Sequence, residues 1–131
     1  MKTKLSLLWG FIISLLAVAP LQAKPPRIIS LAPAITEIVY ALNAEEMLVG
    51  VSSYCDYPPA ARDIPSVGGF INPNIEKIIS LRPDLVILSP NSGTKNIQAT
   101  LERLGIENTV VSFYTLTDLR ESFAVIGTLL D

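Results

Sequence analysis

Short apolar runs and segments of helical periodicity alternate along most of this 131-residue chain. Residues 84–89 (DLVILS) are apolar without alternation, which is typical of a strand that is covered on both faces. Another segment carries apolar residues at positions i, i+3, i+4 and i+7, namely Ile35, Ile38, Val39 and Leu42. That spacing predicts a helix with one buried stripe. Strands and helices in alternation predict a doubly wound α/β fold, in which right-handed crossovers wrap a parallel sheet.

The other expected elements repeat this alternation. Strands are predicted at residues 27–31, 47–52, 84–89 and 106–113, and helices are predicted after Pro33, Asn74, Gly93 and Thr115. Residues 72–74 (NPN) offer a capping asparagine for the second helix and a proline suited to its first turn, and Gly105 is suited to end the third. Thr115 and Asp118 have the spacing of a capping box. The residues predicted to face the core from the last three helices are Ile75, Ile78, Ile79, Ile97, Leu101, Leu104, Leu119, Phe123, Ile126 and Leu130.

A long segment without periodicity, residues 53–74, separates the second strand from the second helix and is rich in proline and glycine. Loops of this length are uncommon inside a compact domain and are usually functional. Ligands of open parallel sheets bind beyond the carboxyl ends of the strands. Residues 33–36, the 53–74 loop and residues 90–93 are all expected there, so the sequence predicts one binding face made of these three segments.

The composition argues against several classes of function. Histidine is absent, which removes the commonest general base and the commonest transition-metal ligand. Acidic residues outnumber basic ones, which disfavours binding to nucleic acid. Cys55 is the single cysteine and has no basic neighbour in the sequence, so a packing role is expected for it and no disulfide within the chain. We therefore expect no catalytic residue, no metal site and no resident cofactor.

The N-terminal residues have the pattern of a secretory signal. Lys2 and Lys4 precede an uncharged apolar run over residues 5–19, which is shorter than the roughly 20 residues that span a bilayer. Ala23 suits the cleavage position. We expect a signal peptide at residues 1–23 and one exported domain at residues 24–131, located in the periplasm of a Gram-negative cell, with a retained membrane anchor as the alternative.

Three segments resemble the Fe/B12 periplasmic-binding family: residues 27–37 (RIISLAPAITE), 50–59 (GVSSYCDYPP) and 66–84 (SVGGFINPNIEKIISLRPD). Members of that family are class III clamps, in which a long helix links two α/β lobes that hold the ligand between them. The resemblance covers the first lobe only. It implies that residues 24–131 form the N-terminal lobe of a monomeric, non-enzymatic receptor. The receptor would capture cobalamin as a transported ligand and deliver it to the membrane permease of an ABC importer, which is powered by a separate ATPase.

The same resemblance implies roles for individual residues. Tyr54 falls on the family tyrosine that lies against the corrin ring, and Phe70 falls where cobalamin binders have a tryptophan. Glu76 matches the acidic residue that docks onto the permease. Ordinary loop packing is the alternative for the two aromatic residues, and a favourable charge at a helix start is the alternative for Glu76. Further ligand contacts are expected from the other two loops, at Pro33, Ala34, Asn91 and Ser92.

Three other functions stay open from the sequence. The family also contains binders of ferric siderophores and of haem, and an arginine-lined cleft would favour a siderophore. A periplasmic enzyme is possible for an α/β lobe, although the chain has no histidine and no nucleophile motif. An inert single-lobe fragment is the third alternative, because no glycine or proline ends the last predicted helix and a lone lobe would leave much of a corrinoid in water.

Overall fold

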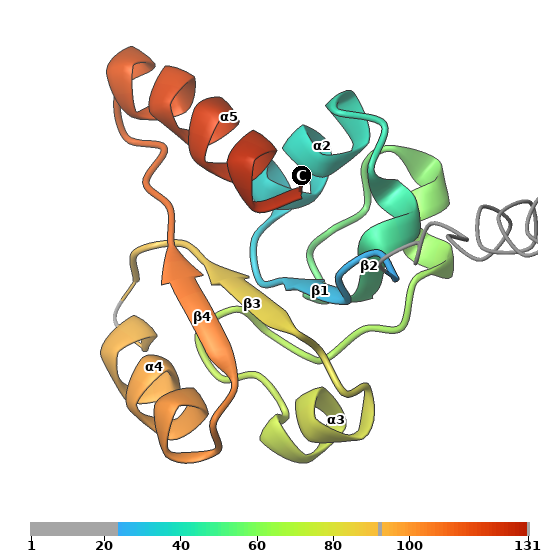
Figure 1. Cartoon of the computed structure of the whole chain (residues 1–131), viewed down its shortest axis with the longest axis vertical. Helices are drawn as coiled ribbons and strands as arrows, with labels where there is room; N and C mark the ends of the chain where they lie inside the picture. The colour runs from blue at the N-terminus through green and yellow to red at the C-terminus, as the bar shows by residue number, and fades with distance from the viewer. Residues whose placement is uncertain (1–23, 92, 131) are drawn as a thin grey trace, which may run out of the picture.

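The fold is built on a four-stranded, fully parallel sheet with the strand order β2-β1-β3-β4 (Figure 1). The computed structural model describes residues 24–91 and 93–130, so the predicted signal peptide and Ser92 lie outside the described residues. The strands are β1 (Ile28–Ser30), β2 (Leu48–Val51), β3 (Leu85–Leu88) and β4 (Glu107–Val110). The predicted parallel α/β architecture is confirmed.

Helices cover both faces of this sheet. In Figure 1, α2 (Pro33–Ala41) and α5 (Leu116–Leu130) lie over one face, and α3 (Ile75–Ser80) and α4 (Thr94–Arg103) lie over the other. Two short 3₁₀ helices, Glu45–Met47 and Pro59–Asp63, lie in the connections before and after β2. Within the described part of the chain, no helix has both the length and the apolar character needed to cross a bilayer.

Strand β3 joins the two halves of the core. Its four residues are all buried, because side chains alternate between the two faces of a strand and both faces are covered. Leu85 and Ile87 pack in the cluster under α2 and α5. Val86 and Leu88 pack in the cluster under α3 and α4. The run without alternation in the sequence is therefore a central strand, as predicted.

The predicted helix ends are confirmed in detail. Asn74 caps α3, since its side-chain oxygen accepts a hydrogen bond from the Lys77 backbone N–H at 2.9 Å. Gly105 follows α4 with a φ of +69°, a conformation that glycine adopts without steric cost. Thr115 and Asp118 form a reciprocal capping box at the start of α5: each backbone N–H donates to the other residue's side-chain oxygen.

The predicted buried stripes are wrong at several positions. The core-facing side of α5 carries Ser122, Ile126 and Leu130, because the helix packs against α2 with a different rotation from the one that its large apolar residues suggest. Pro73 lies before the cap residue and bridges to Gly68, so it is not in the first turn of α3. Residues predicted to be buried that are instead exposed over more than a third of their surface are Leu42, Ile79, Leu104, Leu119 and Phe123.

Candidate functional site

The loops that follow the four strands leave the sheet at one end, which we call the carboxyl edge, because all four strands are parallel. The long loop after β2 folds back beside its own strand. The Ser53 N–H donates to the Gly68 carbonyl at 2.8 Å, and Val67 N–H donates to the Val51 carbonyl at 2.8 Å. These bonds bring the two ends of the loop together although about 15 residues separate them in the sequence. The loop therefore presents its residues at a defined place on the carboxyl edge.

Tyr54 and Phe70 form an aromatic pair on this edge. Their ring centroids are 5.4 Å apart, and the ring planes meet at 71°, an edge-to-face arrangement that aromatic rings prefer. Tyr54 is 60% exposed, whereas Phe70 is half-buried. The structure thus brings together the two aromatic residues that the resemblance singles out, with one ring open to solvent and the other supporting it.

Asn91 connects the loop after β3 to this pair. Its side-chain amide donates to the Phe70 carbonyl at 3.5 Å and to the Ser89 carbonyl at 3.1 Å. Its side-chain oxygen accepts from the Gly93 N–H at 2.7 Å. Both ends of the Asn91 side chain are therefore engaged with the backbone, and this geometry suits a residue that holds Phe70 in place.

Pro33 and Ala34 lie half-buried in the first turn of α2, above a buried polar network. Thr36 Oγ1 lies 2.8 Å from Ser30 Oγ and 3.2 Å from Cys55 Sγ, and Ser52 Oγ lies 3.2 Å from the same sulfur. The network ties the first turn of α2 to the residue next to Tyr54. Cys55 is buried, and these contacts match the packing role expected for it.

Tyr114 is a residue of the carboxyl edge that the sequence reasoning missed. It follows β4, its side chain is 77% exposed, and its hydroxyl donates to the Pro90 carbonyl at 3.0 Å. An aromatic residue directly after a predicted strand was the available signal, but the resemblance attached no role to that position.

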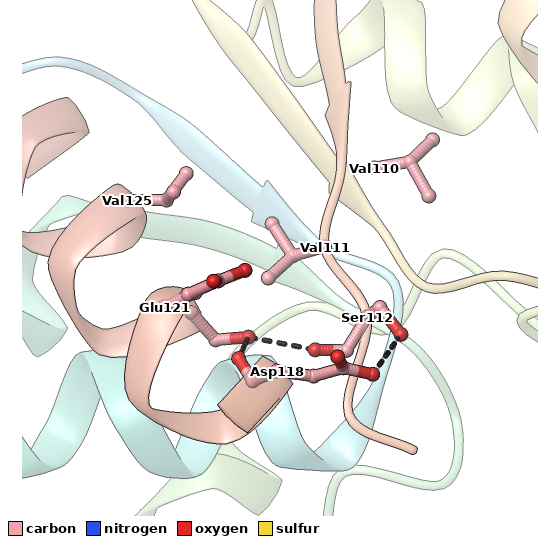
Figure 2. Close-up of a pocket in the computed structure, with 7 residues that line it drawn as sticks. Val110, Val111, Ser112, Asp118, Glu121 and Val125 are labelled. Carbon is pink, nitrogen blue, oxygen red and sulfur yellow. Dashed lines mark hydrogen bonds between the residues drawn. The ribbon is translucent and has the colours of Figure 1, made fainter. Parts of the chain in front are cut away.

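A pocket of about 230 Å³ lies between the end of β4 and the start of α5 (Figure 2). Ser112 Oγ donates to the Asp118 carboxylate at 2.7 Å, and Ser122 Oγ lies 2.7 Å from the carbonyl oxygens of both Ser112 and Asp118. The hydrogen bond from Ser112, followed by those from Thr115 and from the Tyr114 N–H, holds the pKa of Asp118 below its ordinary value of 3.8. The polar groups here are used to fix α5 onto β4, so we do not assign a ligand to this pocket.

The lowered pKa of Asp118 predicts how stability depends on pH. A carboxyl group with a lower pKa in the folded state stabilises the fold above its ordinary pKa, and that contribution is lost as the pH falls through the folded value. We therefore expect the unfolding temperature of the unmodified chain to exceed that of Asp118→Asn at pH 7, and the difference to shrink below pH 3.8. Circular dichroism melts between neutral and acid pH measure it. Asp63→Asn, at an exposed carboxylate, is the control, and a gap for Asp118→Asn that stays constant with pH would contradict the prediction.

No group of three or more histidine, cysteine or acidic side chains in residues 24–91 and 93–130 is placed to hold a metal ion. Glu76 is exposed in the first turn of α3, where a protein partner can reach it. Ser92, which was predicted to contact a ligand, lies outside the described residues.

A sequence model of periplasmic binding proteins matches residues 28–131. The chain belongs to this family. It is 43% identical over 107 residues to the vitamin B12-binding protein of Vibrio vulnificus, which covers 82% of this chain and 37% of the relative. The family and the relatives named here are described as binding proteins.

Two solved structures of the family have the same fold. The periplasmic vitamin B12-binding protein of Vibrio cholerae superposes with a TM-score of 0.73 at 38% identity, over 79% of this chain and 41% of that one. A periplasmic haem-binding protein of Pseudomonas aeruginosa superposes with a TM-score of 0.76 at 30% identity, over 82% and 39%. The chain thus spans about two fifths of the length of the proteins that it matches.

Proposed function

We propose that residues 24–131 form the N-terminal lobe of a periplasmic receptor that captures cobalamin and delivers it to the permease of an ABC importer. The observation that carries this proposal is the Tyr54–Phe70 pair, held at the carboxyl edge of a periplasmic-binding-protein fold. A second lobe would cover the opposite side of the ligand. The signal peptide at residues 1–23 would direct export and then be removed.

The pair suits a large, flat ligand. Rigid aromatic rings bury much apolar area at little cost in conformational entropy, and the exposed Tyr54 ring rests on Phe70. In this proposal Tyr54, Phe70, Pro33 and Ala34 contact the corrin ring. Asn91 holds the Phe70 backbone, and Ser92 stays a predicted contact.

Haem is the second candidate ligand, because a haem-binding structure superposes on this fold as well as the B12-binding one does. An aromatic pair can pack against either macrocycle. Haem iron also needs an axial ligand, and residues 1–131 contain no histidine; the exposed tyrosines of the carboxyl edge or a group from elsewhere in the receptor would supply it. A ferric siderophore has less support. The Arg27 side chain is bonded to the carbonyls of Leu81 and Arg82, and Arg62 lies 3.8 Å from Asp56.

Ligand titration of the full chain, recovered from the periplasm of its host, tests the proposal. The intact mass first shows whether cleavage follows Ala23. Calorimetric titration then compares cyanocobalamin, haemin and a ferric hydroxamate siderophore. We expect one molecule of cyanocobalamin to bind with a Kd below about 1 μM and the other two ligands to bind more weakly. Tighter binding of haemin would establish the second candidate, and no binding of any of the three would support an inert protein.

Glu76 is proposed to dock on the permease, and charge reversal tests this role. Because like charges across an interface repel, Glu76→Arg is expected to reduce uptake of labelled cyanocobalamin by whole cells about tenfold or more, equivalent to about 1.4 kcal/mol or more of docking free energy. Its affinity for the ligand in solution should stay unchanged. Glu102→Arg, at another exposed glutamate on α4, is the matched control. Equal uptake by the two variants would remove the docking role from Glu76.

A further inference from the structure

Tyr114 combines strong exposure with a fixed position. Its side chain is 77% exposed, yet its hydroxyl donates to the Pro90 carbonyl at 3.0 Å and its backbone N–H donates to Asp118 Oδ2 at 3.1 Å. The ring is therefore open to contact from solvent while its position is fixed. Because both its backbone and its side chain are already held, little conformational freedom would be lost when a ligand packs against it.

Hydrogen bonds connect Tyr114 to the aromatic pair through the loop after β3. Tyr114 bonds to Pro90, the next residue is Asn91, and Asn91 donates to the Phe70 carbonyl at 3.5 Å. Phe70 in turn contacts Tyr54. These contacts link the three segments that carry the rings at the carboxyl edge.

The two exposed rings approach the loop after β3 from opposite outer strands of the sheet. Tyr54 follows β2 and Tyr114 follows β4, and these strands are the two outer strands of the sheet. With neighbouring strands about 4.8 Å apart, three strand spacings separate the two outer strands by roughly 14 Å. A ligand that contacts both rings would reach across the loop after β3.

The geometry points to Tyr114 as a further ligand-contacting residue, which favours broad, flat ligands by supplying a second exposed aromatic contact on the other side of the loop after β3. This inference rests on the proposed function of Tyr54 and Phe70. It adds a residue for which neither the resemblance nor the relatives' names provide a role.

Titration of the full chain with cyanocobalamin, and with haemin in parallel, tests the inference. Tyr114→Ala is expected to weaken the affinity for the macrocycle that the unmodified protein binds by about fivefold to tenfold. Tyr114→Phe retains the ring but loses the bond to Pro90, so a smaller loss of about twofold to threefold is expected. Leu116→Ala is the matched control, since Leu116 is two residues away and 82% exposed. The Leu116→Ala variant should bind the macrocycle with the same affinity as the unmodified protein. Thermal unfolding of all variants shows that the fold is retained.

Three results would overturn the inference, and they are distinguishable. If the unmodified protein binds a macrocycle and Tyr114→Ala binds it equally well, Tyr114 makes no contact although the proposed function stands. If Tyr114→Phe loses as much affinity as Tyr114→Ala, the hydroxyl acts by holding the Pro90 loop and the ring makes no contact. If the unmodified protein binds neither macrocycle, the proposed function itself fails, and the role of Tyr114 fails with it.

Discussion

Tyr54→Ala is expected to weaken the binding of cyanocobalamin to the full chain by roughly 30-fold, the loss typical of a central aromatic anchor in an interface. The substitution removes the ring that is 60% exposed on the carboxyl edge. It also leaves the Phe70 ring without its edge-to-face partner, which lies at 5.4 Å. Calorimetry measures the affinity. The unfolding temperature should change only slightly, because most of Tyr54 is exposed in the folded protein.

Two variants accompany this measurement. Tyr54→Phe keeps the ring and should retain an affinity within about threefold of the unmodified protein, if apolar contact is what matters. Tyr57→Ala is the matched control, because Tyr57 lies on the same loop and is 64% exposed but takes no part in the aromatic pair. Equal losses for Tyr54→Ala and Tyr57→Ala would contradict a specific role for Tyr54 and would favour a general effect on the loop.

Gly93→Ala is expected to destabilise the fold by about 1–3 kcal/mol, the usual cost of overpacking a close contact. A Cβ atom at Gly93 would overlap the Ile71 carbonyl oxygen and would lie 3.3 Å from the Asn91 side-chain oxygen. The Gly93 backbone has a φ of −93°, which any residue adopts, so the cost comes from the overlap. The carbonyl belongs to the main chain and cannot rotate away, so the segment that carries Phe70 must shift.

Urea denaturation measures this loss of stability, and titration with cyanocobalamin should show weaker binding as well, because Phe70 precedes the displaced residue. Gly127→Ala is the matched control, and its expected change in stability has the opposite sign. Gly127 lies inside α5, and a Cβ atom there meets no heavy atom within 4 Å. Alanine should therefore stabilise the helix by about 0.5–1 kcal/mol. Unchanged stability of Gly93→Ala would show that the loop is free to move apart at this contact.

The structure confirms the parts of the fold that depend on neighbouring residues. Asn74, Gly105 and the Thr115–Asp118 box act at helix ends as predicted, because capping involves residues only a few positions apart. The unbroken apolar run of β3 identified a strand with both faces covered. Successive side chains of a strand point to opposite faces, so a run without polar residues indicates that both faces are buried. The resemblance named Tyr54 and Phe70 as separate candidate ligand contacts, and their contact with each other comes from the structure.

The rotation of α5 could not be predicted in this way. Leu119 and Phe123 are larger and more apolar than Ser122, yet Ser122 faces the core. Its hydroxyl is satisfied there by the carbonyls of Ser112 and Asp118, which removes the usual penalty for burying a polar group. Apolar periodicity contains no information about that partner, so it favoured the wrong face.

The sequence alone therefore determined the local structure. Residues within a few positions of one another encode the alternation of strands and helices, the helix caps and the central strand. The proposed binding face depends on distant segments. The bond from Tyr114 to Pro90 and the close approach of Gly93 to Ile71 each join residues from different loops, and the contact of Tyr54 with Phe70 joins the two ends of one long loop. Only the parallel sheet, by bringing the carboxyl ends of its strands to one edge, decides that these residues meet.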